Sequence, residues 1–232
     1  MQRYFSENKK GNILYLNDED LHHIFNVMRM KENDNVEIIY DETLYICSVS
    51  KTGFEIITKI NQEQIKKPYI NLIVPILKEA KMDIIIQKST ELGVDEITVV
   101  NTERTIVKAN GKEEKKLNRW QKIAKEASEQ SKRVTIPKIN GIIDLHSLKN
   151  IEGLKVICST NQDSTSLKYL LQNNLTCAKI TLVIGPEGGL STNEEEHLVK
   201  MGFNRVTFGN FVLRSETVPL YLLSIINYIS ME

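Results

Sequence analysis

The spacing of apolar residues changes once along this chain of 232 residues, and that change most constrains the fold. Up to about residue 68 the sequence reads mostly as short strands, "VEIIY", "LYICSVS" and "FEIITKI", separated by "DET" and "KTG". These separations suit tight turns, so we predict a small antiparallel barrel over residues 1–68. One helix, "NDEDLHHIFNVMRM", interrupts the strands and begins at Asn17 or Asp18. Its expected apolar stripe consists of Leu21, Ile24, Phe25 and Met28.

Beyond residue 68, predicted strands alternate with predicted helices. The strand candidates are Ile70 to Ile76, Glu96 to Val100, Leu154 to Cys158, Lys179 to Ile184 and Arg205 to Phe208. The helix candidates are residues 80–92, 115–131, 164–172, 192–201 and 217–229. This alternation predicts an α/β domain over residues 69–232, with a mostly parallel sheet and helices on both faces.

Composition argues against several classes of protein. With 41% hydrophobic and 26% charged residues, the chain is typical of soluble globular proteins. It has neither an apolar run of roughly 18 residues nor the apolar core of a secretory signal, so we expect a cytoplasmic protein without a membrane partner. Cys47, Cys158 and Cys177 occur singly, which predicts small buried side chains. We expect no metal, because nothing completes a site around His22 and His23.

The charges are distributed unevenly although the net charge is zero. From Arg104 to Lys138, eleven Lys or Arg oppose four Glu, which gives +7, and the rest of the chain is acidic by the same amount. Such a local field attracts a polyanion such as a nucleic acid. The segment also contains the helix "KEEKKLNRWQKIAKEASEQSKR", so a solvated helix face with i,i+4 ion pairs explains the same charges equally well.

A glycine-rich loop, "GPEGGLS", follows the predicted strand that ends at Ile184. In an open parallel sheet, ligands bind at the carboxyl ends of the strands, where "STNQDST" and "GNFVLRSET" also lie. The glycines let a ligand approach the backbone closely. Ser191 and Glu194 form a capping-box signature, which satisfies the first donors of the next helix from within the chain. A phosphate needs those donors free, and Glu187 also disfavours an anion.

The common phosphate-binding motifs are also missing from the sequence. It contains no G-x-x-x-x-G-K-[ST], and its glycine cluster does not fit G-x-G-x-x-G. A neutral or cationic ligand with hydrogen-bonding edges suits the loop better, and S-adenosylmethionine, a sulfonium with an adenine and no phosphate, meets that description. The alternative is a glycine-rich turn that only connects a strand to a helix.

Six segments match one known family, in the same order and over nearly the whole chain. They are "HHIFNVMRM", "KMDIIIQKSTELGV", "NTERTIVK", "EASEQSKRVTIPKI", "LVIGPEGGLS" and "FGNFVLRSET". Together they resemble the ribosomal RNA small subunit methyltransferase E family. The resemblance implies a methyltransferase that uses S-adenosylmethionine to methylate N3 of a uridine near the 3′ end of 16S rRNA. It also implies a PUA-like RNA-binding barrel, a SPOUT-class domain with a deep trefoil knot, and a homodimer with the cofactor site beside the subunit interface.

The resemblance assigns the cofactor to three loops. Its residues are Ser159, Thr160, Ile184, Gly185, Pro186, Glu187, Gly188, Gly189, Phe208, Gly209, Leu213, Ser215 and Thr217. The chain departs from the family at Phe208, where Leu is more common, and at Val218 and Pro219. A proline in the first turn of a helix is tolerated, because its missing N–H would be unpaired there.

The reaction that the resemblance implies requires a stabilised uridine anion. N3 becomes nucleophilic when its proton leaves, and the charge then spreads onto O2 and O4. We expect Arg214 to stabilise this charge and Glu129 or Glu216 to accept the proton. Glu216 could instead complement a helix dipole, and Glu129 could form a salt bridge on its own helix.

Five residues are candidates for contact with 16S rRNA or with the small ribosomal subunit. They are His23, Arg29, Lys88, Arg104 and Arg133, any of which could instead make an intramolecular ion pair. Two other classes remain open. An RNA-binding protein without activity would not need two glycine loops, and a nucleotide-dependent enzyme would need phosphate donors that the sequence lacks.

Overall fold

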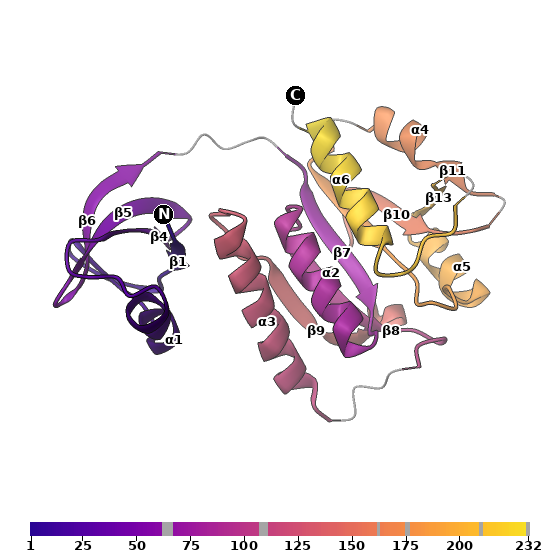
Figure 1. Cartoon of the computed structure of the whole chain (residues 1–232). Helices are drawn as coiled ribbons and strands as arrows, with labels where there is room; N and C mark the ends of the chain where they lie inside the picture. Colours follow the sequence, from indigo (N-terminus) through magenta and orange to yellow (C-terminus); the bar gives the residue numbers. More distant parts are fainter. Residues whose placement is uncertain (62–66, 107–110, 162, 175–176, 209–210, 231–232) are drawn as a thin grey trace. The chain divides into compact units, whose positions relative to one another are not determined.

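The chain forms two compact units in the computed structural model, which describes residues 1–61, 67–106, 111–161, 163–174, 177–208 and 211–230 (Figure 1). Unit 1 comprises Met1–Gln64 and Lys125–Ile136, and unit 2 comprises Ile65–Ala124 and Pro137–Glu232. Residues 125–136 thus belong to unit 1, whereas the predicted domains were residues 1–68 and 69–232.

Unit 1 is built on a curled six-stranded sheet with the order β1-β4-β5-β6-β3-β2. Its strands are β1 (Arg3–Phe5), β2 (Asn8–Lys10), β3 (Ile13–Tyr15), β4 (Asn35–Tyr40), β5 (Thr43–Ser50) and β6 (Gly53–Ile60). Only the β1–β4 pair is parallel, so the predicted antiparallel character is largely confirmed. The sheet curls around a core of Tyr4, Leu14, Ile24, Val36, Ile38, Cys47, Val49 and Phe54.

The helix of unit 1 corrects one prediction. Helix α1 (Asp18–His22) starts at Asn17, whose side chain accepts a hydrogen bond from the Asp20 N–H, and it continues as the π-helix η1 (His23–Val27). Hydrogen bonds of the i→i+5 type widen the side-chain spacing beyond the α-helical period. Ile24 is therefore buried, but Phe25 and Met28 are 43% and 47% exposed, so the predicted stripe is wrong at these two residues.

Unit 2 contains a seven-stranded sheet in which every neighbouring pair is parallel. The order is β11-β13-β10-β12-β7-β8-β9. Its strands are β7 (Tyr69–Pro75), β8 (Glu96–Asn101), β9 (Lys138–Asp144), β10 (Leu154–Cys158), β11 (Thr165–Ser166), β12 (Lys179–Val183) and β13 (Asn204–Thr207). The five predicted strands agree with this sheet to within one residue at each end, which confirms the parallel α/β architecture.

Helices cover both faces of this sheet. They are α2 (Glu79–Glu91), α3 (Glu113–Gln130), α4 (Leu167–Gln172), the 3-10 helix η2 (Leu145–Ser147), α5 (Thr192–Lys200) and α6 (Val218–Ser230). On one face Leu198 of α5 packs with Ile73, Ile157 and Val183. Side chains alternate along a strand, so Leu72, which is as buried as its neighbour Ile73, lies on the other face. Helices α2 and α6 run side by side on that face (Figure 1).

Strand β9 was not predicted from the sequence. It pairs only with β8 and forms one edge of the sheet. Its residues are half-buried or exposed, so it lacks the continuous apolar run of a central strand. The Asn140-Gly141 pair in its middle is also a typical turn signal.

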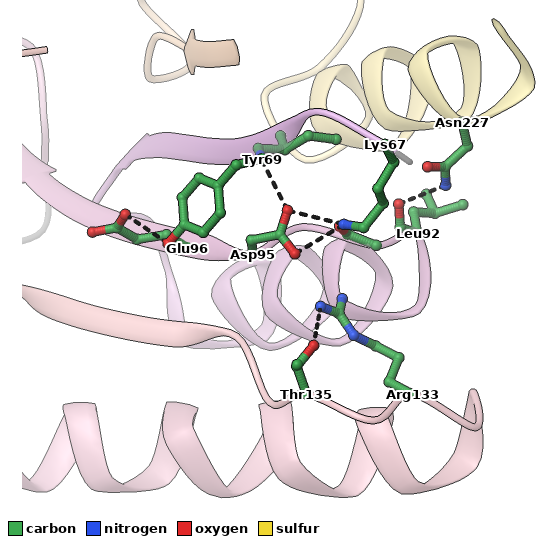
Figure 2. A network of polar contacts seen from close by, with 10 residues as sticks. Lys67, Tyr69, Leu92, Asp95, Glu96, Arg133, Thr135 and Asn227 are labelled. Atoms are coloured by element: carbon green, nitrogen blue, oxygen red, sulfur yellow. Dashed lines mark hydrogen bonds and ion pairs between the residues drawn. The ribbon is translucent and has the colours of Figure 1, made fainter. Parts of the chain in front are cut away.

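A polar network fixes the start of β7 in unit 2 (Figure 2). Asp95 accepts hydrogen bonds from Lys67 Nζ at 2.8 and 2.9 Å and from the Ile70 N–H at 2.9 Å. Asn227 of α6 donates to the Leu92 carbonyl at 2.6 Å. These bonds anchor β7 and α6 to the turn between α2 and β8. Side-chain hydrogen bonds therefore add to the backbone bonds of the sheet in this part of unit 2.

Candidate cofactor site

A cavity of about 560 Å³ opens at the carboxyl edge of the sheet in unit 2, where β10, β12 and β13 end. The loops that follow these three strands line it, so the three loops singled out in the sequence do converge. This volume lies within the range of small-molecule sites, which is roughly 300 to 1,000 Å³.

The glycine loop, residues 185–190, is shaped by its own backbone. A Cβ atom added at Gly185 would lie 3.0 Å from the Leu190 nitrogen and 3.2 Å from the Gly189 Cα, and Gly189 has a φ of +70°. Side chains at these two positions would therefore strain the turn. The loop thus presents main-chain groups directly to the cavity.

The helix after this loop begins with the predicted capping box. The Ser191 hydroxyl accepts a hydrogen bond from the Glu194 N–H, and the Glu194 carboxylate accepts one from the Ser191 N–H at 2.7 Å. The second oxygen of Glu194 accepts the Glu103 N–H at 2.8 Å. Since the capping box occupies donors at this helix terminus, it is poorly suited to bind a phosphate.

Two cations at the cavity already have partners. Arg104 Nη1 donates to the carbonyls of Gly188 and Leu190 at 2.8 and 3.2 Å. Lys81 Nζ lies 2.8 Å from a Glu187 oxygen and 3.1 Å from a Glu216 oxygen. Arg214 also lines the cavity, and within the part of the chain that the structure describes its guanidinium has no hydrogen-bond partner.

Most of the predicted cofactor residues line this cavity. They are Ser159, Thr160, Gly185, Pro186, Glu187, Gly188, Gly189, Phe208, Leu213 and Ser215. Among the described residues, Ile184 and Thr217 do not line it: Ile184 is buried at the end of β12 and Thr217 is exposed. The predicted Gly209 lies outside the described residues. The hydroxyl of Ser159 donates to Glu195, which also binds Arg205 Nε at 2.9 Å.

Sequence reasoning missed several residues of the cavity. These are Lys81, Cys158, Leu190, Glu195, Thr207, Phe211, Val212 and Val218. Arg104, predicted to contact RNA, donates hydrogen bonds to the glycine loop, and its role in RNA binding stays a prediction. Cys158 was expected in the core and instead lies half-buried at the cavity, because it is the last residue of β10.

The two candidate proton acceptors differ in their surroundings. Burial alone would raise the pKa of Glu216, but its own backbone N–H and the Lys81 ammonium hold that pKa below its usual range. Glu129 belongs to unit 1, where its carboxylate lies 3.2 Å from Lys125 Nζ. Burial raises the pKa of Glu129 to about 7, because Lys125 also pairs with Asp20 and cannot fully compensate.

The structure places the remaining RNA candidates on separate elements. In unit 1, His23 Nδ1 lies 2.9 Å from the Tyr4 hydroxyl, Arg29 is exposed with a φ of +54°, and Arg133 donates to the Thr135 hydroxyl at 3.3 Å. In unit 2, Lys88 pairs with Glu91 of the same helix at 2.8 Å. Their role in RNA binding stays a prediction.

The basic segment around α3 is partly neutralised by acidic side chains. Arg119 pairs with Glu79 and Asp83 of α2, and Lys132 pairs with Glu37 of β4. Within α3, Lys125 and Glu129 form an i,i+4 pair. The alternative of internal ion pairs thus explains part of this charge.

The described residues contain no helix long and apolar enough to cross a membrane. They also contain no group of three or more His, Cys, Asp or Glu side chains that could hold a metal ion.

The cavity fits S-adenosylmethionine on chemical grounds. Its main-chain cradle can bind the hydrogen-bonding edges of an adenine. The carboxylates of Glu187 and Glu195 neutralise Lys81 and Arg205, so these cations do not favour an anion. The capped helix does not favour a pyrophosphate. Arg214 lines the cavity, where its guanidinium can face a developing negative charge.

Two family models match the chain. An RNA methyltransferase domain matches residues 65–227, and an RNA methyltransferase PUA domain matches residues 16–60. Together the models cover parts of both units.

Relatives are similar over the full chain. Ribosomal RNA small subunit methyltransferase E of Bacillus subtilis is 34% identical, over 98% of this chain and 96% of the relative. The crystal structure of that enzyme from Neisseria gonorrhoeae, bound to S-adenosylmethionine, is 30% identical with a TM-score of 0.87, and covers 99% of this chain and 98% of its own. A methyltransferase from Legionella pneumophila, solved with the same cofactor, is 29% identical with a TM-score of 0.87, over 97% and 96% of the two chains. The chain therefore belongs to the ribosomal RNA small subunit methyltransferase E family of RNA methyltransferases.

Proposed function

We propose that this protein transfers a methyl group from S-adenosylmethionine to N3 of a uridine in 16S rRNA, near the 3′ end. The observation that carries the proposal is the glycine-loop cavity beside a helix whose capping box occupies donors that a phosphate would need. The relatives from Neisseria gonorrhoeae and Legionella pneumophila bind S-adenosylmethionine, which supports the same cofactor here.

The cofactor, when bound, supplies the electrophilic methyl group. Ser159, Thr160 and the backbone of the glycine loop would hold it, together with Phe208 and Leu213 of the third loop. Ile184, Gly209 and Thr217 remain proposed contacts of the same loops. The chain itself must then position the uracil and stabilise its anion.

Arg214 is the proposed donor to that anion. Its guanidinium lines the cavity without a hydrogen-bond partner among the described residues, so it can donate to O2 or O4 of the uracil. Preorganised donors of this kind stabilise charge that develops in the transition state.

We propose Glu129 or Glu216 as the proton acceptor, and their pKa values favour Glu129. A general base works best when its pKa lies near the working pH, and burial brings the pKa of Glu129 to about 7. Glu216 has a lowered pKa and an ion pair with Lys81, which makes it a weaker base.

RNA binding and assembly complete the proposal. The domains are proposed as a PUA-like RNA-binding barrel over residues 1–68 and a trefoil-knotted SPOUT domain over residues 69–232. Cytoplasmic location follows from a ribosomal substrate. A homodimer is also proposed, and the exposed apolar side chains of Ile84, Phe211, Val212, Tyr221 and Tyr228 on unit 2 are candidates for its interface.

Mass spectrometry of 16S rRNA tests the proposal. Cells that lack the protein should lose one methyl group on a uracil ring, and purified wild-type protein with S-adenosylmethionine should restore it on naked rRNA or on small subunits. Arg214→Ala should abolish the restoration while it changes cofactor affinity by less than about tenfold, or roughly 1.4 kcal/mol. Full restoration by Arg214→Ala would refute the role of this residue, and an unchanged methyl inventory in the deleted strain would refute the substrate.

A further inference from the structure

Lys81 is the one side chain of α2 that lines the cavity among the described residues. Its ammonium lies 2.8 Å from Glu187 of the glycine loop and 3.1 Å from Glu216 of residues 211–217, which we call the third-loop segment. Lys81 therefore contacts two loops that are separated in sequence by a helix and a strand.

The position of Lys81 in its helix is unfavourable by itself. Helix α2 begins at Glu79, so Lys81 lies in the first turn, where the helix dipole disfavours a positive charge. The two carboxylates offset this disadvantage. A lysine at such a position is better explained by its partners than by helix formation.

The two carboxylates depend on Lys81 in turn. Because both contact the same nitrogen, their oxygens lie within about 6 Å of each other. Two negative charges at this distance repel, and the repulsion would act between the two loops if the ammonium were removed.

We propose that Lys81 is a positioning residue that ties the glycine loop to the third-loop segment and so fixes the width of the cavity. Its effect on the cofactor rests on the proposed function, but the tie between the loops does not. A ligand whose binding depends on this tie is one that contacts both loops at once.

Hydrogen exchange in the ligand-free protein tests the tie directly. The Gly189 N–H is bonded to the Pro186 carbonyl at 2.8 Å and the Thr217 N–H to the Arg214 carbonyl at 2.8 Å, so each loop carries a protected reporter. Lys81→Met should accelerate exchange of both amides at least tenfold, and Lys81→Arg should keep the protection.

Lys88→Met is the matched control. Lys88 lies on the same helix and, among the residues that the structure describes, pairs with Glu91 of that helix alone, so this variant should exchange like the wild type at both reporters. If Lys81→Met exchanges within twofold of Lys88→Met, the proposal is wrong.

A change on one loop should alter hydrogen exchange on the other loop. This second measurement distinguishes a tie between the loops from destabilisation of a single loop. Glu216→Gln should accelerate exchange at Gly189, on the other loop, at least threefold, and the same change in the Lys81→Met background should add nothing. An unchanged Gly189 amide in Glu216→Gln would overturn the tie.

Calorimetry separates this proposal from the proposed function. Lys81→Met should weaken binding of S-adenosylmethionine and of its demethylated product at least tenfold each, because in the proposed site both would contact the two loops. If the wild type binds neither compound, the proposed function fails while the exchange results still decide the role of Lys81. If Lys81→Met binds both as tightly as the wild type, the role in fixing the cavity is wrong.

Discussion

Two regions of this protein contain the same set of charges, one lysine between two carboxylates. In unit 1, Lys125 Nζ lies 2.5 Å from Asp20 and 3.2 Å from Glu129. In unit 2, Lys81 Nζ lies 2.8 Å from Glu187 and 3.1 Å from Glu216. Each set joins segments that are distant in the sequence.

The pKa of Glu129 in the first set nevertheless shifts in the opposite direction to those of Glu187 and Glu216 in the second. Burial raises the pKa of Glu129 to about 7. The hydrogen bond from Lys81 lowers the pKa of Glu187 below its usual value, and Glu216 is lowered as well. The number of charges is equal, so solvation and backbone donors decide the direction. One set can hold a proton near neutral pH, and the other stays ionised as a structural tie.

The largest expected effect is on kcat, and it distinguishes Glu129 from Glu216 as the proton acceptor. If Glu129 accepts the uridine proton, Glu129→Gln should lower kcat by about 10² to 10⁴-fold. In the wild type kcat should rise with pH through about 7, since only the ionised carboxylate accepts a proton, and Glu129→Gln should lose this rise. Single-turnover methylation of rRNA from pH 5.5 to 8.5 measures both.

Glu216→Gln is the control for that experiment. It should keep the pH dependence and change kcat less than Glu129→Gln does, because its lowered pKa makes it a weak base. The assignment of roles is reversed if Glu216→Gln, and not Glu129→Gln, removes the rise with pH.

The next largest effect is on the free energy of unfolding, which Lys125 should influence more than Lys81. Lys125→Met leaves the buried Asp20 and the half-buried Glu129 without their cation, which should destabilise unit 1 by about 2 kcal/mol after allowance for partial exposure. Lys81→Met should destabilise unit 2 by less, because its set is more exposed. Native-state hydrogen exchange of the β4 and β7 amides reports each unit separately, and equal losses would contradict the comparison.

A smaller effect is the pH dependence of unit 1. The folded pKa of Glu129 is raised above its value in the unfolded chain, so the folded state binds more protons between about pH 4.5 and 7. Its stability should therefore fall over this range, by about 1 to 2 kcal/mol from this residue. Exchange of the β4 amides at pH 5 and 7.5 should show the fall in the wild type and not in Glu129→Gln.

The smallest effect is on cofactor affinity and involves Arg104, whose partners are backbone carbonyls that do not titrate. Arg104 donates to the carbonyls of Gly188 and Leu190, so Arg104→Ala should weaken S-adenosylmethionine by about tenfold or less through the lost support of the glycine loop. This weakening should be the same at pH 5 and pH 8. Calorimetry at both values tests it, and a change in rRNA affinity alone would contradict the support of the glycine loop and favour the predicted role of Arg104 in RNA binding.

Much of the fold could be predicted from periodicity and from local signals. The central strands β7, β10 and β12 are continuous apolar runs, and the capping box of Ser191 and Glu194 predicts the start of α5. Edge elements were harder, because β9 carries an Asn-Gly pair and the two-residue β11 carries no apolar signal. The π-helix was missed because its i→i+5 bonding has no known sequence signal in this segment, whose apolar spacing reads as an ordinary α-helix.

The site was predictable where it consists of loop backbone and not where it depends on side chains from elsewhere. The glycine loop is local in sequence, and its residues line the cavity as predicted. Lys81 reaches the same loop over 106 positions and Arg104 over 84, so no local pattern reveals either contact. A lysine in the first turn of α2 was the available signal for Lys81.

Calorimetric titration of the purified protein with S-adenosylmethionine, ATP and NAD tests the central claim most directly. We predict that S-adenosylmethionine binds once per chain and that ATP and NAD do not bind, because the capped helix favours no phosphate. Binding of NAD or ATP at this cavity without binding of S-adenosylmethionine would contradict the account.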